Sequence, residues 1–289
     1  MKQLLVLTDF SRAAIHAAKY AYSLAKQIQA NVILFNAVII PAEVPQVGLI
    51  VWPLEGSEAL VEESEAELEK LKLQLQINDE KTLPHPAISM ISKHGTLHHA
   101  VKEILEETSI DYMVIATHRP GWSGLMLGDH TRTLIDEVGG PLFIVSPLVK
   151  IAPIRKIAFA TDFENPDNDL QTITKVIALA GLLSAGVYIT HVYRESEASP
   201  DFYQAVQKIM LDISCVNDYP KIHYKAIKNT DIKEGLRGLA SSDMDLLVLV
   251  HHSHSFLHML IIGSLTQKLA GEVAIPLLVF REAPAPPLI

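Results

Sequence analysis

The sequence holds a single cysteine, Cys215, among its 289 residues. One cysteine cannot form an intrachain disulfide or a thiolate metal cluster. Basic residues are also outnumbered: 24 lysines and arginines stand against 33 aspartates and glutamates, which gives a formal charge of -9. Proteins that bind nucleic acid through charge need a basic face. We therefore expect a disulfide-free protein without a nucleic-acid partner.

Long hydrophobic runs are missing as well. The first apolar run, in MKQLLVLTDFSR, stops at Thr8 and Asp9 and is too short for a signal peptide. No later run approaches the roughly 20 residues of a membrane span. Hydrophobic residues still make up 49% of the chain, enough for a buried core. We expect a cytoplasmic protein that does not bind membranes.

What the sequence does contain is an internal repeat, the feature to look for first because it determines the fold assignment. KQLLVLTDFS at residues 2–11 matches RKIAFATDFE at 155–164, and IDYMVIATH at 110–118 matches MDLLVLVHH at 244–252. Near the end of each copy, PLFIVS matches PLLVFR. Because these segments recur in the same order, we predict two domains, residues 1–150 and residues 151–289.

Each copy alternates apolar strands with helical stretches. This pattern predicts a doubly wound, five-stranded parallel-sheet α/β sandwich, Rossmann-like and repeated in tandem. Strands such as YMVIA and LLVLV are apolar throughout, as expected when helices cover both faces of a parallel sheet. The first copy also carries an acidic helical stretch around residues 55–76, which we interpret as an insertion.

In an open parallel sheet, ligands bind beyond the carboxyl ends of the strands, where the strand order reverses. Asp9 and Ser11 follow the first strand of copy one, and Asp162 follows the first strand of copy two. Short oxygen-bearing side chains also cap helices. Capping and ligand contact are therefore both open roles for these residues.

A second candidate segment follows the fourth strand of each copy, where a loop leads through a glycine into a helix. The N–H groups at a helix N-terminus form an anion site. Gly263 and Ser264 offer backbone and hydroxyl donors to a phosphate in copy two. In copy one, Gly128 is followed by Asp129, whose carboxylate repels phosphate and suits a helix cap better.

These features together resemble the universal stress protein family: the Thr-Asp-Phe turn, the DYMVIATH-type fourth strand, the Gly-Ser step and the closing Pro-Leu strand. The resemblance covers both copies. It implies a tandem stress-response binding protein with ATP or AMP as its ligand. The sequence offers no Ser-His-Asp or Cys-His constellation, so we do not expect an enzyme; an ATP-consuming enzyme is the third alternative. It also implies adenine contact at the end of the second strand, at Val38 and Val192, although packing alone explains apolar residues there equally well.

The same resemblance implies how the copies associate. Domains of this family pair through their last strand, so we expect an intrachain pseudo-dimer with an approximate two-fold axis and a separate core in each half. Association of two whole chains into a homodimer is a further option.

The chain departs from the glycine pattern that ATP-binding members carry after the fourth strand. Ala116 and Arg119 stand at the positions of the glycine pair in copy one, and His251 and His254 stand there in copy two. Glycines let backbone N–H groups approach phosphates without a Cβ in the way. The alternative function is therefore a scaffold, or a protein that binds another small ligand at decayed sites.

Copy two contains a run of histidines, and imidazole is a common zinc ligand. No carboxylate lies within the run, and its spacing fits no established ligand pattern. We predict that the protein, purified without a histidine tag, carries no stoichiometric zinc by elemental analysis. Bound zinc that disappears in a His252→Ala, His254→Ala variant would contradict this prediction.

Overall fold

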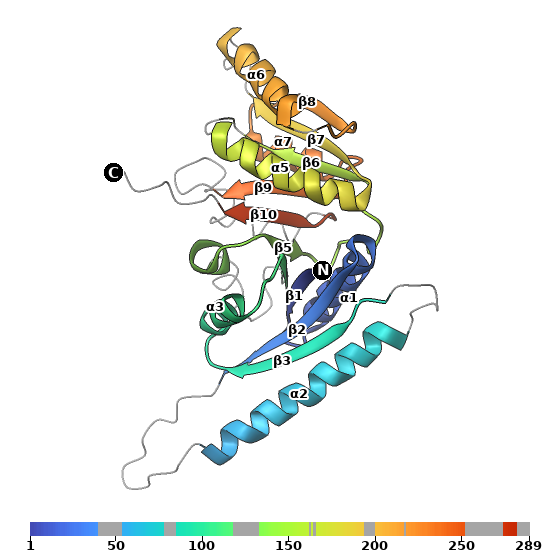
Figure 1. Cartoon of the computed structure of the whole chain (residues 1–289), viewed down its shortest axis with the longest axis vertical. Helices are drawn as coiled ribbons and strands as arrows, with labels where there is room; N and C mark the ends of the chain where they lie inside the picture. The colour runs from blue at the N-terminus through green and yellow to red at the C-terminus, as the bar shows by residue number, and fades with distance from the viewer. Residues whose placement is uncertain are drawn as a thin grey trace, which may run out of the picture.

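The computed structural model describes residues 1–39, 54–77, 85–117, 133–161, 163, 166–193, 200–216, 218–251 and 274–281. Their strands form one sheet of ten, in the order β3-β2-β1-β4-β5-β10-β9-β6-β7-β8 (Figure 1). The first half consists of β1 (Lys2–Leu7), α1 (Arg12–Ile28), β2 (Ala30–Val38), α2 (Leu54–Ile77), β3 (Ile88–His94), α3 (Leu97–Glu107), β4 (Tyr112–Ala116), the π-helical turn η1 (Leu134–Val138) and β5 (Leu142–Val145). The second half consists of β6 (Lys156–Ala160), α5 (Pro166–Leu183), β7 (Gly186–Tyr193), α6 (Pro200–Val216), β8 (Ile222–Lys228), α7 (Ile232–Ala240), β9 (Leu246–His251) and β10 (Leu277–Arg281).

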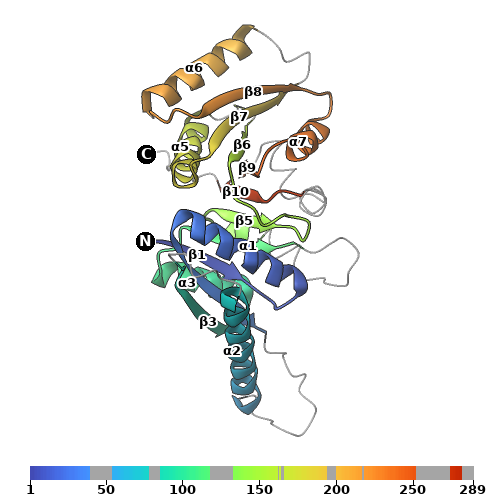
Figure 2. The same cartoon turned by 90° about the vertical axis from the view of Figure 1, so that its right-hand side faces the viewer.

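The two halves have the same topology. Within each half all neighbouring strands are parallel, and the order β3-β2-β1-β4-β5 recurs as β8-β7-β6-β9-β10. Helices lie on both faces of the strands, as α5 and α7 do on opposite sides of the second half (Figure 2). The predicted pair of five-stranded, doubly wound sandwiches is confirmed. No helix within the described residues has the length and apolarity that crossing a bilayer requires.

The halves join where β5 and β10 pair in antiparallel fashion, and we call this junction the seam. In the repeat, Leu142 corresponds to Leu277 and Ile144 to Val279. The pair Leu142–Val279 is therefore equivalent to the pair Leu277–Ile144, with the two strands interchanged, as a two-fold axis requires. The pairs are Phe143 with Leu278 at the centre, Leu142 with Val279, and Ile144 with Leu277.

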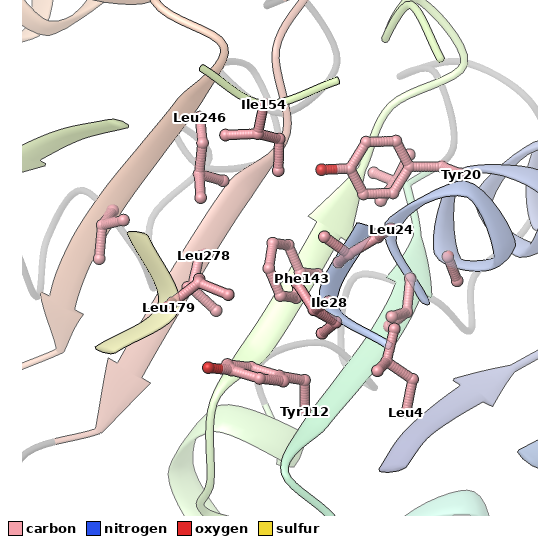
Figure 3. Close-up of a cluster of buried hydrophobic side chains, with 14 of the residues drawn as sticks. Leu4, Tyr20, Leu24, Ile28, Tyr112, Phe143, Ile154, Leu179, Leu246 and Leu278 are labelled. Atoms are coloured by element: carbon pink, nitrogen blue, oxygen red, sulfur yellow. The ribbon is translucent and has the colours of Figure 1, made fainter. Parts of the chain in front are cut away.

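The prediction of a separate core for each half is wrong. Successive strand residues alternate between the two faces of the sheet, and on each face one buried cluster runs through both halves. The cluster under α1 and α5 contains Leu4 of β1 together with Leu246 of β9, and Phe143 and Leu278 meet at its middle (Figure 3). The seam strands are short and apolar on both faces, so their pairing merges the cores instead of separating them.

The extra length of the first copy falls between its second and third strands, as predicted: 49 residues separate β2 from β3, against 28 between β7 and β8. The helix itself is shared, because α6 occupies the corresponding place in the second half. Helix α2 has 24 residues and α6 has 17, so part of the extra length lies in a longer helix. Among the described side chains of α2, those of Ser64, Leu68, Leu71 and Leu75 are buried and spaced to lie on one face of the helix.

The connection between the halves, residues 146–155, runs along helix α1. The His16 imidazole Nε2 lies 2.8 Å from the carbonyl oxygen of Val149. Further along the helix, Gln27 Oε1 accepts the N–H of Ile154 at 3.0 Å. The connection is thus fastened to the first half at two points.

An aspartate before the fourth strand holds the start of the first strand in each half. Asp111 Oδ2 accepts the N–H of Gln3 at 2.9 Å. Asp245, at the equivalent position, accepts the N–H groups of Arg155 and Lys156 at 2.8 and 2.9 Å. Hydrogen bonds to an ionised acceptor are stronger than neutral ones.

We predict that Asp245→Ala lowers the free energy of unfolding by about 1–2 kcal/mol, because two backbone N–H groups at the start of β6 lose a charged acceptor. Urea denaturation followed by circular dichroism measures the change. Asp218→Ala, at an exposed position, is the matched control and should leave stability within about 0.5 kcal/mol of wild type. Equal effects of the two substitutions would contradict the assigned role.

We predict that Phe143→Ala costs about 3–5 kcal/mol, since a fully buried ring is removed from the centre of the seam. Because both clusters cross the seam, the variant should unfold in one transition in which both halves lose structure together. Amide hydrogen exchange, followed separately for peptides of the two halves, reports on each part. Two separated transitions, with only one shifted by the substitution, would show that the halves are energetically independent.

Candidate functional site

The topology places one switch point in each half. In the first half the strand order reverses between β1 and β4, and in the second half it reverses between β6 and β9. Ligands of open α/β sheets bind at such points, beyond the carboxyl ends of the strands. Because β5 and β10 are antiparallel, the carboxyl ends of the strands point in opposite directions in the two halves. The two candidate sites therefore lie at opposite ends of the strands of the shared sheet.

The Thr-Asp-Phe motif forms the same turn at both points. Thr8 Oγ1 accepts the N–H of Phe10 at 3.0 Å, and Thr161 Oγ1 accepts the N–H of Phe163 at 3.0 Å. Phe10 and Phe163 have φ of 60° and 61°, a left-handed conformation that non-glycine residues seldom adopt. The threonine hydroxyl holds this strained turn, and this explains why threonine and phenylalanine recur together.

Asp9 and Ser11 differ in the two roles that the sequence left open, helix capping and ligand contact. Ser11 is the N-cap of α1, and its hydroxyl accepts the N–H of Ala14 at 3.2 Å. Asp9 Oδ1 accepts the N–H of Ser11 at 3.0 Å. The capping prediction is confirmed for Ser11, whereas Asp9 stabilises the turn before the helix from an exposed position at the switch point. Ligand contact by Asp9 stays a prediction.

A polar side chain in the second strand of each half fastens the turn. Asn36 Nδ2 donates to the carbonyl oxygen of Thr8 at 2.7 Å. His191 Nδ1 donates to the carbonyl oxygen of Thr161 at 2.8 Å, and since a carbonyl only accepts, this nitrogen carries the proton. Thr161 Oγ1 in turn donates to the buried carboxylate of Asp169 on α5 at 2.6 Å. Sequence reasoning missed all three side chains, although a polar residue within NVILFNAV or GVYITHVY was a usable indication.

Beyond the turn, the two sites differ. In the first half a chain of hydrogen bonds continues from β2 to α2 and β3, because Ser64 Oγ donates to Asn36 Oδ1 at 2.9 Å and Ser92 Oγ donates to Ser64 Oγ at 2.9 Å. We call these three residues the polar chain.

In the second half the residue equivalent to Asn36 is His191, and its neighbours are aromatic. The His191 ring stacks on Phe163 at 5.3 Å between centroids, with an interplanar angle of 28°. The Tyr193 ring lies 6.4 Å from the His191 ring, at an interplanar angle of 11°. We call these three residues the aromatic stack. One half thus presents amide and hydroxyl groups beside its turn, and the other presents ring faces.

The pairing of Val38 with Val192 is wrong by one residue. Val38 is paired with His94 and its carbonyl accepts the N–H of Gly95, while the equivalent bond in the second half comes from Asn229 to Tyr193. Tyr193 therefore occupies the place of Val38.

Val192 points to the opposite face of the sheet, because a shift of one residue reverses the side chain. It packs closely against Gly235 of α7, where an added Cβ would lie 2.4 Å from the Val192 Cγ1. This close contact gives Val192 a packing role. Val38 is itself largely buried, at 8% exposure.

Four predicted site residues, Gly128, Asp162, Gly263 and Ser264, lie outside the described residues. His252 and His254 of the histidine run lie outside them too. Their assignments stay predictions.

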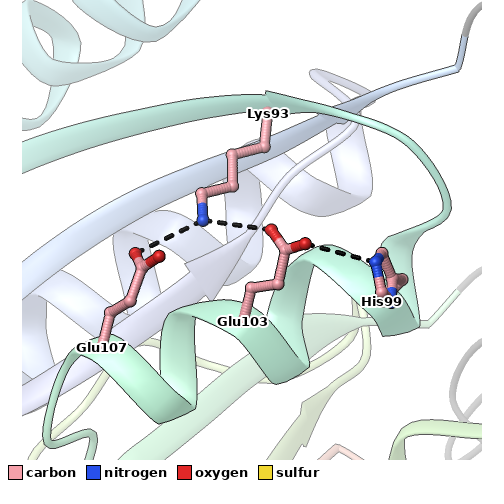
Figure 4. A network of polar contacts seen from close by, with 4 residues as sticks. All are labelled: Lys93, His99, Glu103 and Glu107. Atoms are coloured by element: carbon pink, nitrogen blue, oxygen red, sulfur yellow. Dashed lines mark hydrogen bonds and ion pairs between the residues drawn. The ribbon is translucent and has the colours of Figure 1, made fainter.

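One histidine of the first half, His99, takes part in a charged network on the surface of α3. His94 ends β3, while His98 and His99 lie in the first turn of α3. His99 Nε2 is 3.2 Å from Glu103 Oε1, and Lys93 bridges Glu103 and Glu107 at 3.2 and 3.4 Å (Figure 4). The hydrogen bond that Lys93 donates to Glu103, followed by the one it donates to Glu107, raises the pKa of Lys93 despite the opposing effect of desolvation. Across the described residues, no three histidine, cysteine or acidic side chains are grouped so as to hold a metal ion.

Comparison with known structures extends the likeness over the whole chain. A universal stress protein from Archaeoglobus fulgidus DSM 4304 shares 13% identity, with a TM-score of 0.63 over 97% of this chain and 96% of its own. A universal stress protein candidate from Pseudomonas aeruginosa UCBPP-PA14 shares 14%, with a TM-score of 0.57 over 98% and 94%. The cytoplasmic domain of a prokaryotic cation chloride cotransporter shares 12%, with a TM-score of 0.51 over 96% and 94%. At these identities the likeness establishes the tandem fold alone.

No curated protein matches the sequence. The model of the universal stress protein family matches residues 1–146, which is just over half of the chain, and the second half repeats the topology of the first. The chain belongs to the universal stress protein family.

Proposed function

We propose that this protein binds an adenine nucleotide, ATP or AMP, at the carboxyl edges of its two half-sheets. The observation that supports the proposal most directly is the exposed Asp9 in a rigid turn at the first switch point, with the same turn geometry repeated at Thr161 and Phe163. A fixed turn of this kind presents a polar group to a ligand without reorganisation when the ligand binds.

Further residues complete each proposed site. In the first half we assign Val38 to the adenine and Gly128 to the phosphates. In the second half we assign Asp162 the role of Asp9, and Gly263 and Ser264 act as donors to phosphate. The register of β7 assigns the position equivalent to Val38 to Tyr193, whose ring can stack on a base.

A second candidate is binding of a different small ring-shaped ligand, or scaffolding, without nucleotide. The aromatic stack supports this candidate, since ring faces hold planar ligands of many kinds. Loss of the glycine pair after the fourth strand supports it as well, because side chains at those positions keep phosphates away from the backbone.

The remaining assignments accompany this proposal. Residues 1–150 and 151–289 are two domains that act as an intrachain pseudo-dimer in the cytoplasm. In this proposal the protein acts as a binding protein and not as an enzyme. A turnover assay for ATP hydrolysis tests the last point.

We predict that the second half binds ATP more tightly than the first. Ser264→Asp should weaken binding about tenfold, because a carboxylate would then lie where the phosphates are expected, and Asp129→Ser should strengthen binding at the first half by a similar factor. Isothermal titration of ATP into the wild type and the two variants measures both changes.

Ser241→Asp is the matched control. It makes the same change of charge just after α7, at the amino edge of the second half-sheet, and should leave ATP affinity unaltered. Tight binding that survives Ser264→Asp, or that is lost in Asp129→Ser, would place the phosphates elsewhere. Titration with adenosine separates loss of phosphate contacts from loss of the whole site.

A further inference from the structure

Helix α2 buries one face and leaves large apolar side chains exposed on the other. Leu68, Leu71 and Leu75 pack into the cluster under the helices. Leu73 and Ile77 lie on the opposite side of the helix, where they are 50% and 76% exposed. Helix α2 is the outermost helix of the first half, next to β3 (Figures 1 and 2). Its outer face is therefore accessible to a partner, and covering it removes apolar surface from water.

The outer face of α2 is arranged symmetrically about Ala66. Ala59 lies seven residues before Ala66, and Leu73 lies seven residues after it. Glu62 lies four residues before Ala66, and Lys70 lies four residues after it. All five residues are exposed, and their spacing places them along one face of the helix. We call these five residues the outer stripe.

The charges of the outer stripe are complementary to a reversed copy of the same stripe. Within the described part of the chain, Glu62 forms no ion pair. Lys70 lies 2.6 Å from Glu67, but its side chain is 65% exposed, and an ammonium group has three hydrogens to donate. When a second α2 lies antiparallel with a two-fold axis at Ala66, Glu62 of each copy faces Lys70 of the other. The same axis places Leu73 of each copy on Ala59 of the other.

We propose that the outer stripe is an interface between two copies of this chain, which pair antiparallel through α2. A two-fold axis at Ala66 makes the contact self-complementary, so the association stops at a dimer. The small side chain at Ala59 leaves room for Leu73 of the other copy. The contact uses neither the seam nor a switch point, and it is independent of any nucleotide. Because an interface along one helix is small, we expect a dissociation constant in the micromolar range.

Sedimentation equilibrium of the full chain over roughly 1–200 µM tests for the dimer, since this range brackets the expected constant. Leu73→Glu should raise the dissociation constant at least about tenfold, because it places a carboxylate at the apolar contact. Leu211→Glu is the matched control, since Leu211 is 64% exposed on α6, the helix that corresponds to α2. It should leave the dimer unchanged. A wild-type chain that stays monomeric throughout, or equal weakening by both substitutions, would overturn the interface.

Charge reversal tests the antiparallel arrangement. Glu62→Lys and Lys70→Glu each place like charges at both ionic contacts, so either variant alone should dimerise at least about tenfold more weakly than wild type. An equal mixture of the two variants should regain wild-type affinity, because opposite charges face each other again in the mixed dimer. A misfolded variant could not be rescued in this way. A mixture that associates no better than either variant alone would refute the pairing of Glu62 with Lys70.

Discussion

The antiparallel contact between β5 and β10 is the constraint on which the rest of the molecule depends. Phe143 and Leu278 meet at its centre, and their neighbours exchange partners as two-fold symmetry requires. That single pairing turns two five-stranded sheets into one, merges the buried clusters on both faces, and fixes the opposite directions of the candidate sites. Neither half has a free seam edge, so the short apolar strands PLFIVS and PLLVFR are protected from pairing with other chains.

The sequence was sufficient to predict this arrangement where residues repeat with their physical roles intact. Thr-Asp-Phe recurs because the threonine hydroxyl supports a left-handed phenylalanine in both copies. Asp111 and Asp245 recur because the same backbone N–H groups need an acceptor. Continuous apolar strands correctly indicated a sheet covered on both faces. What the sequence did not convey was that two covered sheets, joined edge to edge, have no interior boundary between their cores.

The misplaced counterpart of Val38 has its origin in a small change of length. Gln29 and Ser184 end the first helix of each half in the same left-handed conformation, with φ of 53°, yet Ser184 lies two residues further from its Thr-Asp-Phe turn. The residue numbers of the second strand are therefore offset between the halves, so that Val192 lies on the opposite face and Tyr193 takes the place of Val38. Such shifts are invisible to sequence matching because apolar residues occur on both faces of these strands.

Fusion of the two halves explains how the sites became chemically different. In a symmetric homodimer every substitution appears at both sites, whereas a tandem chain can change one and keep the other. Asn36 and His191 fasten equivalent turns, and from there the polar chain extends to Ser64 and Ser92 in the first half, whereas the aromatic stack extends to Phe163 and Tyr193 in the second. The connection adds a second asymmetry, because it is fastened to α1 of the first half. The repeated turns recur at both switch points, and the side chains around them differ in chemistry between the halves.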